Sequence, residues 1–270
     1  MAGIDTSVWF RREIGPRLTL SAREILLQWS GLDEKELLPH LDAIRAQAWP
    51  LGEYPCIGLW MFLLPGLAAF PQFAQILAHA KRGDGIVLDL GCGLGQDLRL
   101  LAVHGVPTTQ MWALDVEERL WELGYDLFRD RGRMAAAFIQ ADFLQLAPTT
   151  LPAAKLNVVI AAQFLHLFSW EKQLEAVKKI VDLSSPGTML VGYQQGRQRA
   201  REYLRPWGMM FYHNRESFLR LWDLVQQETR TNWTIEIQEV RLQEWGMQDQ
   251  DLEWMPEDRM GINFVLIRDL

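Results

Sequence analysis

One short segment constrains the fold more than any other: a run of apolar residues that passes directly into a glycine-rich turn. It reads Val87-Leu88-Asp89-Leu90-Gly91-Cys92-Gly93-Leu94-Gly95-Gln96-Asp97. The apolar half predicts a buried strand over 86–90, and the residues after Gly95 predict a helix over 96–103. Glycines in such a turn let backbone amides approach a ligand closely, and the N-terminus of the helix adds positive potential. The segment therefore predicts a nucleotide-like ligand at this turn.

The rest of the chain repeats this alternation of strand and helix. Helices are expected over 117–128, from the N-cap Ser169, and over 216–229. The other strands are predicted at 110–114, 136–140, 157–162, 188–192, 233–240 and 261–268. Strands that alternate with helices favour a parallel sheet covered on both faces, and the last two strands favour an antiparallel pair at one edge. The predicted fold class is α/β, with a mostly parallel seven-stranded sheet and an antiparallel last strand.

The N-terminal part has a different pattern, which predicts a helical cap over residues 1–65. Ser21 and Glu24 have the spacing of a capping box for a first helix, and Asp33 begins a second helix. We therefore expect two parts: this cap, and one compact ligand-binding domain over 66–270.

Composition excludes several classes of function. The net charge of −7, with 23% charged residues, predicts an acidic surface and no nucleic-acid-binding face. The two cysteines, Cys56 and Cys92, are too few for a disulfide framework or a four-ligand zinc site. We expect no metal, and a reducing compartment, the cytoplasm. The longest apolar run, 57–70, is broken by Pro65 and Gly66, so no membrane span is expected.

Acidic residues end the second and third predicted strands. Asp115 is placed to accept hydrogen bonds from the hydroxyls of a ribose. Asp142 is placed to accept from an adenine amino group, with Phe143 beside the ring. Because the carboxyl ends of parallel strands meet at one edge of a sheet, these residues predict a single adenosine-binding crevice.

Two kinds of nucleotide fit such a crevice differently. A dinucleotide fold requires a third glycine at the position of Gln96, and it brings Asp89 against a pyrophosphate of the same charge. A cationic sulfonium with an amino-acid tail suits the acidic strand end better. In 86–97, Asp115 and Asp142, the chain resembles the class I S-adenosylmethionine methyltransferases.

This resemblance implies a Rossmann-like class I methyltransferase fold. It also implies S-adenosyl-L-methionine as the cofactor and S-adenosyl-L-homocysteine as the product. In that family the glycines line the methionine and ribose. Gln163, after the fourth strand, is placed to touch the amino-acid end of the cofactor, and closing the strand is its alternative role. The predicted cofactor-binding residues are Asp89, Gly91, Cys92, Gly93, Gly95, Asp115, Val116, Asp142, Phe143 and Gln163.

A narrower resemblance concerns the fungal methyltransferases of meroterpenoid pathways. It extends over residues 45–180 and resumes at 216–222, and it rests on 54–58, 91–97, 122–130 and 164–170. Those enzymes esterify a carboxyl group on a farnesylated aromatic polyketide before cyclisation. The resemblance implies a hydrophobic small-molecule acceptor from fungal secondary metabolism. Phenol or carbon methylation, an NAD-dependent oxidoreductase and a non-catalytic cofactor-binding protein are the alternatives.

Two histidines are candidates for the transfer step. His166 follows the fourth strand, where related folds place the transferring methyl, and a structural histidine among aromatic residues is its alternative. His213 lies in an expected acceptor-binding loop. The alternative is a solvated loop in which Asn214 caps the next helix. No histidine has an evident carboxylate partner. A carboxylic acid is ionised at neutral pH whereas a phenol needs a base, so this favours a carboxyl acceptor.

A basic cluster follows the fifth strand. Arg197, Arg201 and Arg205 are predicted to bind the acceptor, since a guanidinium fork holds a carboxylate well. A solvated helical face is the alternative. The sequence leaves the oligomeric state open between monomer and homodimer.

Overall fold

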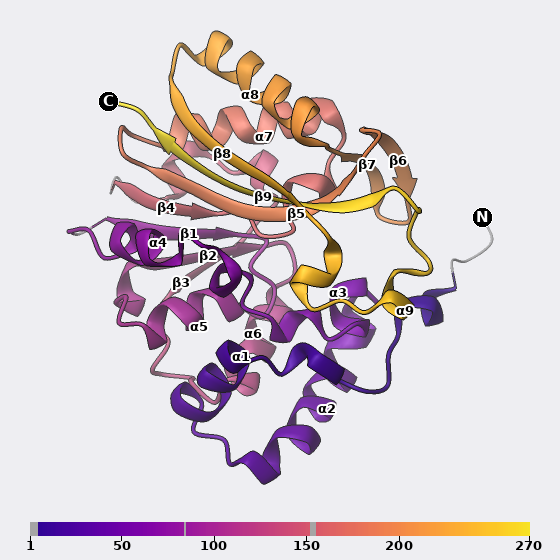
Figure 1. The fold of residues 1–270 in the computed structure, drawn as a ribbon. Coiled ribbons are helices and arrows are strands. Elements are labelled where there is room, and N and C mark those ends of the chain that lie inside the picture. Colours follow the sequence, from indigo (N-terminus) through magenta and orange to yellow (C-terminus); the bar gives the residue numbers. More distant parts are fainter. Residues whose placement is uncertain (1–4, 84, 152–154) are drawn as a thin grey trace.

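A seven-stranded sheet forms the centre of the protein, and Figure 1 shows it with helices on both faces. The computed structural model describes residues 5–83, 85–151 and 155–270. The strand order is β3-β2-β1-β4-β5-β9-β8. The bounds are β1 (Ile86–Leu90), β2 (Met111–Asp115), β3 (Ala137–Gln140), β4 (Leu156–Ile160), β5 (Met189–Arg197), β8 (Trp233–Val240) and β9 (Arg259–Arg268).

The pairing of the strands confirms the predicted sheet. The first five strands are parallel, and β9 runs antiparallel to both β5 and β8. The chain moves outward from β1 to β3 on one side and from β4 to β5 on the other. The strand order therefore reverses between β1 and β4, and ligands bind at the carboxyl ends of strands beside such a reversal.

Alternate residues of each central strand enter different hydrophobic clusters. Val87 packs towards the side of α4 (Phe73–Ala80), α5 (Gln96–Val103) and α6 (Glu118–Leu127). Leu88 packs towards α7 (Trp170–Leu183) and α8 (Arg215–Thr229). This alternation follows from the two-residue period of a strand, and it explains why strands covered on both faces are apolar throughout.

The N-terminal region is helical, in agreement with its sequence pattern. It contains α1 (Leu20–Arg23), a π-helical continuation (Glu24–Trp29), α2 (Leu37–Ala48) and α3 (Pro55–Gly58). Its apolar residues share one hydrophobic cluster with α5 and α6. Residues 1–4 of the predicted cap lie outside the described residues.

The start of the first helix differs from the prediction. Thr19, not Ser21, is the N-cap, and its side chain accepts a hydrogen bond from Ala22 N at 3.2 Å. A capping box at Ser21 and Glu24 is therefore wrong, because the helix has already begun there. The predicted start of the second helix at Asp33 is confirmed, with a capping box between Asp33 and Glu36.

The segment between β5 and α8 is a second correction. In place of a loop it forms a hairpin of β6 (Arg201–Arg205) and β7 (Gly208–Tyr212), which lies beyond the end of the main sheet in Figure 1. A helical face for the arginines is also wrong. Residues 201–205 show no alternation of apolar and polar residues, so the sequence carries no clear signal for this hairpin.

Candidate active site

The glycine turn after β1 holds an open backbone that only glycine adopts readily. Gly91, Gly93 and Gly95 have positive φ angles of 68°, 53° and 77°, in the region that favours glycine. Gly91 N and Cys92 N donate to Leu114 O at 2.8 and 3.1 Å, which fixes the turn against β2. A Cβ on Gly91 would lie 2.9 Å from the Phe164 ring, whereas a Cβ on Gly93 would meet nothing within 4 Å. The turn therefore presents its backbone to open space at Gly93.

Asp115 joins this turn to the start of α6. Its Oδ2 accepts from Gly93 N at 2.9 Å, and its Oδ1 accepts from Glu117 N at 3.0 Å. Burial raises the pKa of Asp115, and these two amide bonds act against that rise. Each carboxylate oxygen still has a lone pair for a further donor, such as a ribose hydroxyl.

Two more carboxyl groups lie close behind the turn. Asp89 and Asp97 are 4% and 2% exposed, and Asp97 Oδ1 accepts from Leu67 N at 3.0 Å. Burial raises the pKa of Asp97 to about 7. Burial also raises the pKa of Asp89 well above its usual range, with Asp97 and Asp115 adding like charge. A cationic ligand relieves this repulsion, whereas a pyrophosphate increases it.

Three further predicted residues lie at the ends of β2 and β3. Asp142 is exposed, and its Oδ1 accepts from Leu144 N at 3.0 Å, which caps a short 3-10 turn. Phe143 is 2% exposed and packs edge-on against Phe164, with ring centroids 5.9 Å apart. Val116 is 62% exposed and offers an apolar surface at this end.

A buried network that the sequence reasoning missed supports the glycine turn from behind. Arg99 is fully buried and donates to both oxygens of Asp130, at 2.9 and 3.1 Å. Its Nη1 also donates to Leu94 O at 2.9 Å. Trp29 Nε1, from the N-terminal region, donates to Asp130 Oδ2 at 2.8 Å. An arginine between apolar residues of a short helix was the only signal for this network in the sequence.

At the end of β4 the chain makes a tight turn that carries His166. Gln163 has a φ of 51°, and its N donates to Tyr193 O at 2.6 Å. His166 is 4% exposed, and its Nδ1 has no partner among the described residues. Burial, together with a smaller effect of the Arg205 charge, lowers the pKa of His166 to about 3. His166 is therefore neutral at pH 7 and a weak base.

His213 is held by protein groups on both sides of its ring. Nδ1 bonds Ser217 Oγ and Nε2 bonds Gln173 Oε1, each at 2.9 Å. Burial lowers its pKa to about 3. The expected capping by Asn214 is confirmed, since Asn214 Oδ1 accepts from Ser217 N at 2.9 Å. Neither ring nitrogen of His213 is left for an acceptor.

The three predicted arginines gather around one aromatic ring. The guanidinium carbons of Arg197, Arg201 and Arg205 lie 4.3, 4.6 and 6.0 Å from the centroid of Tyr203. Their surroundings differ. Arg197 is buried and forms an ion pair with Asp258, and Arg201 is exposed on the edge strand β6. Arg205 Nε donates to Tyr212 Oη at 3.2 Å and lies near His166.

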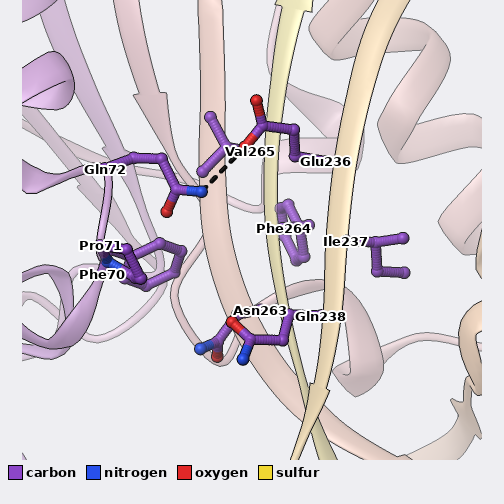
Figure 2. A pocket seen from close by; sticks show the side chains of 9 residues that line it. All are labelled: Phe70, Pro71, Gln72, Glu236, Ile237, Gln238, Asn263, Phe264 and Val265. Atoms are coloured by element: carbon purple, nitrogen blue, oxygen red, sulfur yellow. Dashed lines mark hydrogen bonds between the residues drawn. The ribbon is translucent and has the colours of Figure 1, made fainter.

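A separate groove of about 130 Å³ lies between the start of α4 and the strands β8 and β9. Figure 2 shows Gln72 and Glu236 meeting across it, with Gln72 Nε2 2.8 Å from Glu236 Oε2. None of the residues that line it belongs to the predicted cofactor or acceptor sets. Within 5–83, 85–151 and 155–270, no group of three or more His, Cys, Asp or Glu residues is placed to hold a metal ion. In the same ranges no helix has the length and apolar character needed to cross a membrane.

Comparisons with known proteins find methyltransferases that are similar to most of this chain. A family model of the meroterpenoid methyltransferase N-terminal domain matches residues 9–63, and a methyltransferase domain model matches 87–187. The O-methyltransferase phiE of a fungal species is 32% identical, covering 96% of this chain and 92% of phiE. The Asnovolin E/Chermesin D methyltransferase nvfJ of Aspergillus novofumigatus is also 32% identical, over 82% of this chain and 81% of nvfJ.

Solved structures share the fold at low sequence identity. The 1,6-didemethyltoxoflavin-N1-methyltransferase of Burkholderia thailandensis, solved with S-adenosylhomocysteine, has a TM-score of 0.56 and 16% identity. The match covers 88% of this chain and 94% of that one. The N-terminal domain of EvdMO1, also with S-adenosylhomocysteine bound, has a TM-score of 0.55 and 15% identity, covering 88% and 98%.

The strand order and the acidic glycine turn define a class I methyltransferase that uses S-adenosylmethionine. The similarity to phiE and nvfJ extends over most of both chains. The chain belongs to the family of fungal meroterpenoid methyltransferases.

Proposed function

We propose that this enzyme transfers the methyl group of S-adenosylmethionine to a carboxylate oxygen of a hydrophobic acceptor, forming a methyl ester in a meroterpenoid pathway. The observation that carries the proposal is the state of His166 beyond β4. It is buried, its pKa lies at about 3, and its Nδ1 has no carboxylate partner among the described residues. Such a histidine is a poor base for a phenol, whereas a carboxylate needs no base.

Buried donors beside the hairpin support an anionic acceptor. Arg197 Nη1 and Trp254 Nε1 are buried and have no hydrogen-bond partner among the described residues. Arg205 lies 5.8 Å from the Trp254 ring, so its charge acts on the same region. Buried donors are normally satisfied, and a carboxylate accepts from several at once. We propose Arg205, Arg197 and Trp254 as the acceptor anchor.

The proposed cofactor site follows from the geometry of the glycine turn. Asp115 binds the ribose, Asp142 and Val116 border the adenine, and the open backbone at Gly93 leaves room for the ribose and methionine. Asp89 and Asp97 stabilise the positive end of the cofactor. S-Adenosylmethionine supplies an activated methyl group when bound, so these residues need only align it with the acceptor oxygen and exclude water. Charge is lost when a carboxylate meets a sulfonium, which a dry site favours.

The N-terminal region is proposed to cover the acceptor. The Trp207 ring of the β6–β7 hairpin lies 6.3 Å from Trp9 and 6.2 Å from Tyr54. Trp9 also packs 5.0 Å from Trp254. These aromatic contacts bring the predicted cap, the hairpin and the C-terminal segment together beside the arginines. A cap over 1–65 on a cofactor domain over 66–270 is the division that we propose, and we expect the protein to act in the cytoplasm.

The test uses a farnesylated hydroxybenzoic acid as the probe, with the matching farnesylated phenol that lacks the carboxyl group. We expect methylation of the acid to give a product that alkali hydrolyses back to the acid, as an ester requires. The phenol should not be methylated. An alkali-stable methyl ether from either compound would contradict the proposal and would favour a phenol methyltransferase.

A further inference from the structure

Strand β5 carries a fully buried amide whose polar atoms are unmatched within the described part of the chain. The side chain of Gln194 is 0% exposed, and neither its Nε2 nor its Oε1 is paired among the described residues. Leaving such a group unpaired is unfavourable, so buried polar groups are nearly always satisfied. An unpaired amide in this position indicates a missing partner that is small and polar.

Gln194 lies at a gap in the backbone hydrogen bonds along one edge of β5. Before the gap, Gln163 N donates to Tyr193 O at 2.6 Å, so the chain after β4 runs beside β5. After the gap, Arg197 N donates to His213 O at 2.9 Å, so the chain after β7 takes over that edge. Between these two bonds lies the 3-10 turn Leu165–Leu167, which contacts both β5 and β7.

The neighbours of Gln194 on the same face of β5 are glycines. A Cβ on Gly192 would lie 2.3 Å from Ala161 O, and a Cβ on Gly196 would lie 2.3 Å from His213 O. Backbone therefore closes this face on both sides of Gln194. The Gln194 side chain leaves β5 on this face, and the turn that carries His166 contacts β5.

Two further buried atoms in the turn after β4, Gln163 Oε1 and His166 Nδ1, have no partner in the described ranges. The His166 ring lies 6.0 Å from the Tyr212 ring of β7. The set contains an amide donor, Gln194 Nε2, two amide acceptors, and an imidazole nitrogen that takes either role. A carboxylate only accepts and would leave the amide oxygens unpaired. A hydroxyl group donates and accepts, and so it matches the set.

We propose that Gln194 and His166 bind a hydroxyl group of the acceptor, separate from the oxygen that is methylated. This inference rests on the proposed function, in which a carboxylic acid acceptor lies beyond the end of β4. Both residues act as positioning groups that fix the acceptor, with no proton transferred to either. The site makes the enzyme selective for a hydroxylated acid over the same acid without the hydroxyl.

The experiment compares two probes, a farnesylated dihydroxybenzoic acid and the same acid with its ring hydroxyls replaced by hydrogen. Gln194→Met keeps the length of the side chain and removes both polar atoms. We expect it to raise KM for the hydroxylated acid about tenfold, the loss of one hydrogen bond of about 1.4 kcal/mol. The kcat value and the affinity for S-adenosylhomocysteine should stay within about twofold. The KM for the deoxygenated acid should not rise.

Gln227→Met is the matched control, since Gln227 is exposed on α8 and belongs to neither proposed site. It should change neither KM. His166→Phe is a second variant with the same expected pattern, in case Gln194→Met does not fold. An equal rise of KM for both acids, or a loss of kcat in place of a rise in KM, would overturn this assignment alone. Failure of the wild type to methylate either acid would overturn the proposed acceptor together with it.

Discussion

At the scale of single residues, the glycine turn and the carboxylate that joins it were the most predictable features. Asp115 and the three glycines were found because glycine turns and strand-end carboxylates have fixed spacing. Sequence spacing does not predict burial, which decides the protonation of His166. It also does not predict the hydrogen bonds that occupy both ring nitrogens of His213. Gln194 was missed because a glutamine inside a strand has no sequence signature.

The ribose contact can be tested directly. Asp115→Ala removes both acceptor oxygens and also releases Gly93 N. We expect binding of S-adenosylhomocysteine to weaken by about 1–3 kcal/mol, measured by calorimetry. Asp126→Ala, an exposed change on α6, is the control and should leave the affinity unchanged. Unchanged affinity in Asp115→Ala would show that the ribose lies elsewhere.

Asp97 makes stability depend on pH. Its pKa rises from 3.8 to about 7 on folding, so between these values the native state holds a proton that the unfolded state has lost. This contribution is complete below pH 3.8 and is lost as the pH rises through about 7. Asp97→Asn should therefore lose less stability than the wild type between about pH 4.5 and about pH 7.5 in denaturant titrations. Parallel curves for the two proteins would contradict this account.

At the scale of elements, the sheet was predictable and the β6–β7 hairpin was not. Buried parallel strands are continuous apolar runs, which stand out in the sequence. The hairpin is short, and its first strand, β6, contains two arginines and is largely exposed, so the hydrophobic pattern of that strand is weak. The π-helical turn at Glu24–Trp29 was also missed, since such turns depend on packing more than on residue type.

The element that links the N-terminal region to the glycine turn can be tested through Trp29. Trp29→Phe keeps an aromatic ring and removes the 2.8 Å bond to Asp130. Asp130 would then hold Arg99 less firmly, and Arg99 bonds Leu94 O in the turn. We expect weaker binding of S-adenosylhomocysteine, by about threefold to tenfold, since one bond to a charged group is lost.

The control for Trp29→Phe is Trp112→Phe, a change on β2 at a half-buried tryptophan that is no part of this network. It should affect thermal stability without a matching change in cofactor affinity. Equal affinities for the wild type and Trp29→Phe would mean that Arg99 and Asp130 hold the turn without help from the N-terminal region.

At the scale of the whole molecule, distant parts of the chain are joined by buried charge. Arg17 and Arg11, near the N-terminus, both pair with Asp251, which is fully buried near the C-terminus. Removing one partner of a buried pair leaves an uncompensated charge and costs about 3–5 kcal/mol. No sequence pattern predicts a pairing over such a separation.

This pairing predicts how the protein unfolds. Asp251→Asn should lower the midpoint of unfolding and leave a single transition, because the N-terminal region shares its hydrophobic cluster with the sheet. Circular dichroism and tryptophan fluorescence should report the same midpoint. Two separate transitions would show that the N-terminal region unfolds independently of the sheet.

The hydrogen-bonded path from Trp29 to Leu94 has an evolutionary consequence. If relatives acquire new acceptors through substitutions in their N-terminal helices, a substitution near Trp29 should also weaken the binding of S-adenosylmethionine. A substitution at one end of this path then requires a compensating substitution at the other end. Engineering a new acceptor specificity should succeed more often when Trp29, Asp130 and Arg99 are all replaced together by the corresponding residues of one relative.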